Sequence, residues 1–187
     1  MSRTLILAAA IALGLGLAAG AQAQTTPTPA TTPVKHNAAS ETGRDVAQQK
    51  RIEQGLQSGQ LGTGEARKLE AGEARIDKTE QRDLRNGSLS ASERAQIQRQ
   101  QNRESKAIYG DKHNATTGNP DSLKSNLEQA NVQRNINQES RLHNGVTHGS
   151  LTNRELGRAE GGEAHVDRME SHRDTLRNTA RVQRADN

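Results

Sequence analysis

The sequence predicts an all-α protein built from two related helical units. Three observations support this prediction: long segments rich in Gln, Arg and Glu with almost no proline, a gapless repeat between two of these segments, and glycine-containing motifs at regular places. Segments of this composition favour helix, and the glycine motifs mark where one helix ends and another begins.

The first residues are typical of a secretory signal peptide. Arg3 precedes an apolar run over residues 5–17, and the run ends in small residues up to Ala23. The run is too short to span a bilayer, and no second apolar run predicts stable membrane insertion. We therefore expect residues 1–23 to be removed and the protein to be periplasmic or secreted. The sequence has no cysteine, so disulfide and thiolate chemistry are excluded.

The remaining chain divides by composition. Residues 24–40 are rich in Pro and Thr and are expected to form a flexible segment. The first unit, residues 41–109, is expected to contain helices at 42–57, 63–85 and 91–109. Residues 110–121 are rich in turn formers and predict a flexible linker. The second unit, residues 122–187, is expected to contain helices at 122–147 and 152–180 and to be a truncated repeat of the first.

The repeat joins positions that lie ninety residues apart. Eleven of thirty gapless positions are identical, starting from Arg51 and Arg141. Identity at a constant offset indicates duplication of one structural unit.

The pattern GxLxxxE occurs three times, and it predicts a helix end followed by a helix start. Gly59, Gly87 and Gly149 are expected to end helices in the left-handed conformation. In GSLSASE and GSLTNRE, the hydroxyl residue and the Glu three positions later form a capping box. In the first motif Gly62 stands in the cap position, and Thr63 is the alternative cap.

Apolar residues of the helix at 63–85 form a narrow stripe, and acids flank it. We call the acids of this helix, together with their repeat counterparts, the acidic ladder, and predict that the ladder is an interaction surface. Its members are Glu70, Glu73, Asp77, Glu80, Glu160, Glu163, Asp167 and Glu170. Pairing with arginines such as Arg94, Arg99 or Arg103 is favoured over a di-iron type site, because such bundles pair a Glu with a His three residues on.

The glycine loops also resemble degenerate EF-hands, which makes calcium the alternative cofactor; otherwise we expect none. Helix capping explains the same residues better, since Arg82 and Leu84 occupy two positions that are normally acidic. The candidate ligands are Asn86, Ser88, Glu93, Asn144 and Glu155.

Other chemistry finds little support. His143, His148, His165 and His172 correspond to Glu53, Ser58, Arg75 and Arg82 in the first copy. Positions that accept Arg and His equally are surface positions, so we do not predict a zinc site. No catalytic arrangement can be assembled, and we expect the protein not to be an enzyme. The 26 basic and 22 acidic residues are interspersed and the chain has one aromatic residue, so nucleic-acid binding is not predicted.

The stretch RIEQGLQSGQLGTGEARKLEAGEARIDK, followed by NGSLSASERAQIQRQQNRESKAIYGDKHNA, resembles a helical module of short exported Gram-negative proteins without an assigned function. LTNRE and LSASE are more distantly similar to the LTxxQ motif of periplasmic stress chaperones, with Glu in place of Gln. The resemblance implies a non-catalytic envelope, chaperone-like or stress-protective role with a protein partner or self-association. The alternative function is weak calcium or other metal binding through the GxLSxxE loops.

Overall fold

Helices follow one another in the order that the glycine motifs predict. The computed structural model describes residues 38–166, 168 and 169. It contains α1 (Ala39–Gln57), α2 (Thr63–Asp83), a 3-10 turn η1 (Leu84–Asn86), α3 (Ala91–Lys112) and α4 (Leu123–Thr147). A further helix, called here the last helix, begins at residue 153 and includes residues 153–166, 168 and 169. No strand occurs in these residues, so the predicted all-α class is confirmed.

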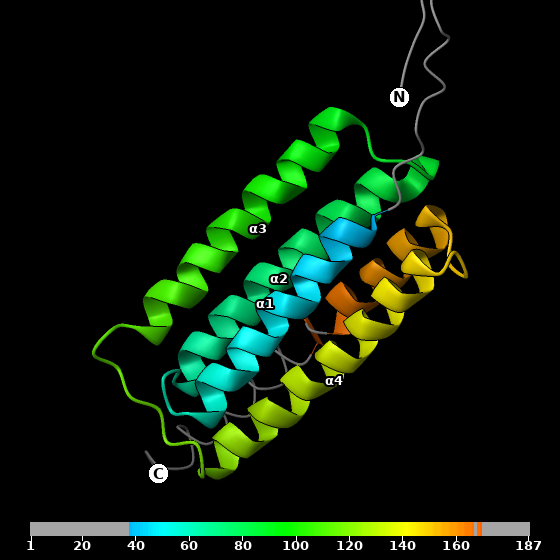
Figure 1. The fold of residues 1–187 in the computed structure, drawn as a ribbon. Coiled ribbons are helices and arrows are strands. Elements are labelled where there is room, and N and C mark those ends of the chain that lie inside the picture. The colour runs from blue at the N-terminus through cyan, green and yellow to red at the C-terminus, as the bar shows by residue number, and fades with distance from the viewer. Residues whose placement is uncertain (1–37, 167, 170–187) are drawn as a thin grey trace, which may run out of the picture. The chain divides into compact units, whose positions relative to one another are not determined.

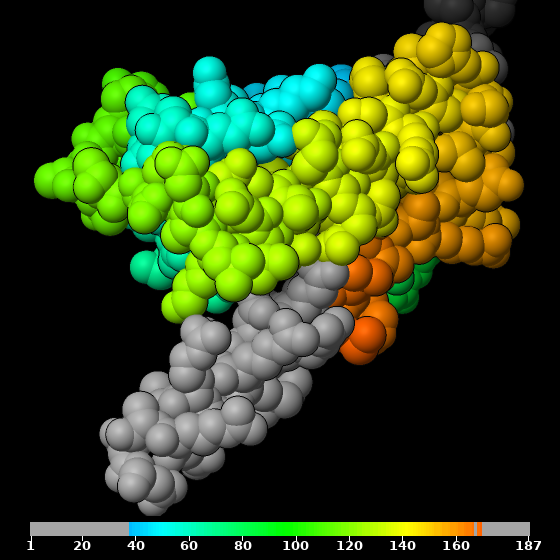
Figure 2. All heavy atoms as spheres, turned by 90° about the horizontal axis from the view of Figure 1, so that it is seen from below, coloured from blue at the N-terminus to red at the C-terminus, as the bar shows by residue number. Residues whose placement is uncertain are grey.

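The helices form a bundle in which segments distant in sequence lie side by side (Figure 1). Contacts between α1 and α4 are the most extensive, and α3 covers α1 and α2 from outside the bundle. Gly43 of α1 lies against His143 of α4, and the last helix passes close to Gln81 of α2 at Gly161. Figure 2 shows α4 crossing one face of the molecule with the last helix beside it.

Two apolar clusters form the core, and each contains residues from both sequence units. The first unit contributes most of the members, while Val132 and Ile136 complete one cluster and Val146 and Leu156 complete the other. The two units therefore share one interior. The first-unit members are Ile52, Leu56, Leu61, Ala66, Leu69 and Ile108 in one cluster and Ile76, Leu84, Leu89 and Ile97 in the other, together with Ala38.

The predicted helix-ending glycines are confirmed. Gly59 and Gly149 have φ angles of 72° and Gly87 has 87°. In the first of these turns the amide of Leu61 donates to the carbonyl of Gly55 at 2.9 Å. A methyl group on Gly55 would lie 2.5 Å from Leu61 Cδ1, so this glycine lets the leucine fold back against the helix.

The capping boxes also form as predicted for two of the three motifs. Ser90 and Glu93 exchange hydrogen bonds at the start of α3, and Thr152 and Glu155 do so at the start of the last helix. At α2 the cap is Gly62, whose amide donates to Glu65 Oε2 at 2.9 Å. The alternative cap Thr63 is wrong, because Thr63 is the first residue of the helix itself.

The remaining boundaries differ by a few residues. Helix α3 extends to Lys112, past the predicted end at 109, and α2 passes into the 3-10 turn at Leu84. The segment between α3 and α4 contacts the α1–α2 turn, where the amide of Gly118 donates to the carbonyl of Gly59 at 2.8 Å. None of the described helices is long and apolar enough to cross a membrane. The predicted signal peptide lies outside the described residues.

The turn geometry leads to a first prediction, for Gly55→Ala. We expect this change to lower the free energy of unfolding by about 1–3 kcal/mol, because the added methyl overlaps the buried Leu61 side chain. Gly162→Ala is the matched control, since nothing lies within 4 Å of a methyl group there. The control should be neutral or stabilising by up to about 1 kcal/mol. Urea denaturation checks both, and equal effects of the two variants would contradict the close packing.

Candidate metal centre in the helical interior

The acidic ladder of α2 faces the interior of the bundle. Glu70, Glu73, Asp77 and Glu80 are all buried, with exposed fractions of 9%, 1%, 5% and 1%. Glu160 on the last helix is equally buried at 1%. The prediction that these five residues form an interaction surface is therefore wrong. They lie in the interior, where neighbouring helices cover them. Sequence periodicity places the acids on one helix face but does not say what covers that face.

The rest of the ladder differs. Glu163 is half-buried and accepts a hydrogen bond from Gln138 Nε2 at 3.3 Å. The side chains of Asp167 and Glu170 lie outside the described residues.

Further buried acids come from α1 and α4, outside the predicted acidic ladder. Glu41 and Asp45 of α1 and Glu139 of α4 are each at most 3% exposed. A signal was present: Glu41 and Asp45 continue, at helical spacing, the face that carries Ile52 and Leu56. Four helices therefore direct carboxylates into one interior.

Asp77, Glu139 and Glu160 form the tightest group, which we call the carboxylate triad. They come from α2, α4 and the last helix, and one oxygen of each lies within 4.8 Å of the other two. All three side chains are buried. Neither oxygen of Glu160 has a hydrogen-bond partner, and Oε2 of Glu139 has none. Glu139 and Glu160 therefore bring acceptor oxygens without a hydrogen-bond donor into this group.

A second position shows how amide groups can donate hydrogen bonds to a buried carboxylate of this protein. Glu70 lies ninety residues before Glu160, and its Oε2 accepts hydrogen bonds from Gln49 Nε2 at 3.2 Å and Asn135 Nδ2 at 2.8 Å. At the same offset, Gln49 corresponds to Glu139 and Asn135 to Asp45. Acids thus stand beside Glu160 where amides serve Glu70, and an ionised acid donates no hydrogen bond.

Burial raises the pKa of these interior acids. The pKa values of Glu139 and Glu160 are raised well above the ordinary value, first by burial and then by neighbouring carboxylates. The same causes raise the pKa of Glu73 and Glu80. For Asp45, burial raises the pKa to about 7, although Gln101 Nε2 donates to it at 2.8 Å. In the absence of a bound cation, the interior therefore favours protonated acids.

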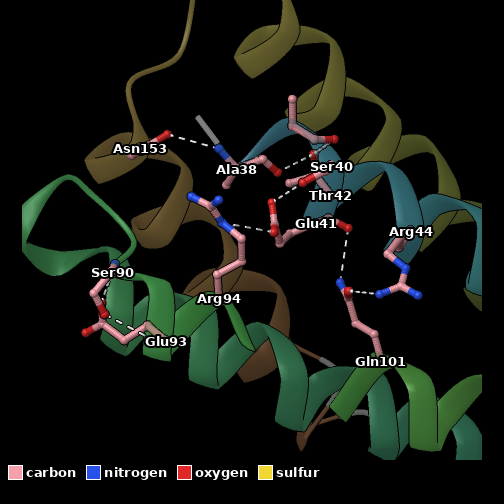
Figure 3. Close-up of polar contacts among 11 residues, drawn as sticks. Ala38, Ser40, Glu41, Thr42, Arg44, Ser90, Glu93, Arg94, Gln101 and Asn153 are labelled. Atoms are coloured by element: carbon pink, nitrogen blue, oxygen red, sulfur yellow. Dashed lines mark hydrogen bonds and ion pairs between the residues drawn. The ribbon is translucent and has the colours of Figure 1, made fainter. Parts of the chain in front are cut away.

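The arginines expected to neutralise the ladder lie elsewhere. Arg94 reaches Glu41 of α1, with Nε 3.6 Å from Oε1 (Figure 3). Gln101 of α3 approaches the same stretch of α1, where its Nε2 donates to the carbonyl of Glu41 at 3.1 Å. Arg99 and Arg103 are exposed, and neither forms an ion pair within the part of the chain that the structure describes. Among the described residues, no arginine or lysine forms an ion pair with Glu160.

The loop residues proposed for calcium are engaged in local hydrogen bonds. Asn86 Oδ1 accepts from the amide of Ser88 at 2.9 Å. Glu93 and Glu155 each accept from the amide and hydroxyl of the cap residue three positions earlier. The carbonyl of Asn144 accepts from the amide of His148 at 2.9 Å. This arrangement is the helix-capping interpretation of the same residues.

No described histidine belongs to the carboxylate triad. His143 lies one turn beyond Glu139, and its Nδ1 is 3.1 Å from the Thr42 hydroxyl. His148 contacts the carbonyl of Asn144 in its own helix, and His165 is exposed. His172 lies outside the described residues. The triad therefore offers oxygen ligands alone.

Oxygen ligands select hard cations. Two ligands on opposite sides of an ion are separated by twice the metal–oxygen distance, which is roughly 4.6–5.2 Å for Ca²⁺. The triad oxygens lie within 4.8 Å of one another, so all three can contact one such ion. Mg²⁺ retains several waters and is held by few carboxylates, so a buried triad suits Ca²⁺ or Mn²⁺ better.

The raised pKa values generate a second prediction, on pH. A carboxyl group whose pKa is raised on folding stabilises the fold below its unfolded pKa, and this stability is lost as pH rises through the folded pKa. For Asp45 the window runs from 3.8 to about 7. Chelator-treated protein should therefore melt higher at pH 5 than at pH 8, by roughly 5–10 °C.

Asp45→Asn should flatten this pH dependence, because Asn keeps the acceptor for Gln101 but does not titrate. Asp121→Asn, at an exposed position, is the control and should leave the profile unchanged. Melting curves by circular dichroism from pH 5 to pH 8 measure the effect. A melting temperature that rises across this range in the chelated protein would contradict the prediction.

Comparison with protein-family models, with curated proteins and with solved structures finds no match to this chain. The resemblances to exported helical proteins and to LTxxQ chaperones stay predictions.

Proposed function

We propose that this protein binds a hard divalent cation, Ca²⁺ or Mn²⁺, at the carboxylate triad inside its helical bundle. One observation carries the proposal. Glu160 is 1% exposed and neither of its oxygens has a hydrogen-bond partner, yet one of them lies within 4.8 Å of oxygens of Asp77 and Glu139. Buried polar atoms in native proteins almost always have partners, and a cation is the partner that three converging carboxylates fit.

The charge of the interior supports the same proposal. Burying one ionised carboxylate costs several kcal/mol, and the cost grows when like charges are neighbours. Either the acids take up protons or a cation balances them. Apolar side chains of similar size would pack the interior without this electrostatic cost. The presence of acids there therefore favours a functional role.

Metal and protons then compete for the same oxygens. Ligands must be deprotonated to bind, so loading the site near neutral pH should release protons. The ligands come from three helices, so a bound ion links α2, α4 and the last helix. We therefore expect binding to raise the stability of the fold, and metal-dependent stability is the property that we assign to this protein.

The predicted export fits this proposal without being part of it. The envelope, chaperone-like and stress-protective roles, self-association and a protein partner also stay predictions. Calcium binding through the glycine loops remains the competing metal proposal. The two metal proposals use different carboxylates, which makes them separable by substitution.

A third prediction tests the triad with calorimetry and thermal melting. Chelator-treated protein should bind Ca²⁺ or Mn²⁺ and melt higher, and at a hundredfold excess over the dissociation constant the stabilisation is about 2.7 kcal/mol. Titration in two buffers that differ in ionisation heat should show proton release. Zn²⁺ is the comparison ion, since its sites favour nitrogen and sulfur ligands.

Glu160→Gln should weaken binding by about tenfold or more, because it removes a charged ligand while keeping the shape. Glu70→Gln is the matched control: it changes a buried acid at the equivalent repeat position, whose neighbours are the amides of Gln49 and Asn135. The control should retain metal-dependent melting.

The double variant Glu93→Gln with Glu155→Gln tests the competing proposal that calcium binds at the glycine loops. If this pair abolishes binding and Glu160→Gln does not, the loop proposal replaces the triad. If neither Ca²⁺ nor Mn²⁺ produces binding heat or a shift in melting temperature, both metal proposals are wrong.

A further inference from the structure

A hollow at the junction of α2, η1 and the last helix is lined by positive charge. Among the described residues, those that line it are Gln81, Arg85, Arg154, Gly157 and Arg158, and its volume is about 390 Å³. Three of the five carry guanidinium groups and none is acidic. The volume falls within the range of ligand pockets and leaves room for a phosphate with an attached group.

The fold brings these arginines together. Arg154 and Arg158 are four residues apart in the first turns of the last helix and therefore share a face. Arg85 comes from η1, directly after Leu84. Between the two arginines of the last helix, a methyl group on Gly157 would lie 2.8 Å from Leu84 Cβ. The glycine thus allows the last helix to approach η1 closely, and this approach sets the width of the hollow.

Some arginines of the described residues form ion pairs: Arg67 pairs with Glu128 at 3.0 Å and Arg82 with Asp83 at 2.7 Å. Glu155 is close enough to Arg158 for that arginine to contribute to lowering the pKa of Glu155, but the two form no ion pair. Arg85, Arg154 and Arg158 form no ion pair with any residue that the structure describes. Three like charges around one hollow repel one another unless an anion lies between them. The positive end of the last helix adds to the attraction, since its first amides lie beside Arg154.

We propose that this hollow binds a phosphate group carrying more than one negative charge. Guanidinium groups match phosphate oxygens in a bidentate manner, and the Gln81 amide supplies a further donor. The phosphate can belong to a free small molecule or to a lipid headgroup, and both offer the same oxygens to the site. The proposal does not depend on the carboxylate triad, because it uses different residues and a ligand of opposite charge.

The test uses inorganic pyrophosphate and the full chain, with metals removed and the chelator dialysed away so that cation chelation does not contribute. Isothermal titration should show micromolar binding that weakens as salt rises. Arg154→Ala with Arg158→Ala should weaken binding at least tenfold. Arg99→Ala with Arg103→Ala is the matched control, since it removes two exposed arginines at the same spacing from α3. The control should change binding less than twofold.

A second arm identifies the source of the phosphate. Vesicles of phosphatidylcholine with and without phosphatidic acid are sedimented with the protein and both double variants. Pyrophosphate binding that depends on Arg154 and Arg158 supports a soluble ligand, and selective loss of phosphatidic-acid binding in that variant supports a headgroup. Equal losses in the two double variants, or binding in neither arm, overturn the proposal.

Discussion

The structure depends on one electrostatic constraint: carboxylates from four helices share an interior that contains few basic groups. Glu73, Glu80 and Glu160 have no hydrogen-bond partner for either oxygen, although each is only 1% exposed. Such an interior is stable only when protons or cations balance the charge. Along α2 the buried acids alternate with residues of both apolar clusters, such as Leu69 and Ile76, so the packing of the bundle and the charge of its centre are linked.

Local signals made the helices predictable, and the absence of tertiary information made the interior unpredictable. Gly59, Gly87 and Gly149, together with Ser90 and Glu93, determine their own conformations within a few residues, so their roles could be inferred without knowing the fold. The burial of Glu70 could not, because its partner Asn135 lies 65 residues away. Helical spacing predicted the acidic face of α2 correctly. The partners that cover this face come from the other helices, and no short motif identifies them.

The two copies of the repeat differ in the residues that correspond around Glu70 and Glu160. Glu70 and Glu160 hold equivalent positions, but Gln49 and Asn135 surround the first while Glu139 and Asp45 correspond to them around the second. An amide supplies a donor at little electrostatic cost, whereas an acid adds charge. Of the two related positions, Glu70 accepts hydrogen bonds from two amides of the protein, whereas neither oxygen of Glu160 has a hydrogen-bond partner. That asymmetry supports a single metal site more strongly than the number of acids does.

The shared cores also bear on how the chain matures. Val146 and Leu156 complete one of the two apolar clusters, and Glu160 completes the carboxylate triad, so this part of the interior is unfinished until the last helix has been made. Until then we expect the interior acids to be hydrated and charged, so that their mutual repulsion opposes collapse of the incomplete chain around a partial core. Acids that are costly to bury in the folded protein would thus help to keep the nascent polypeptide soluble.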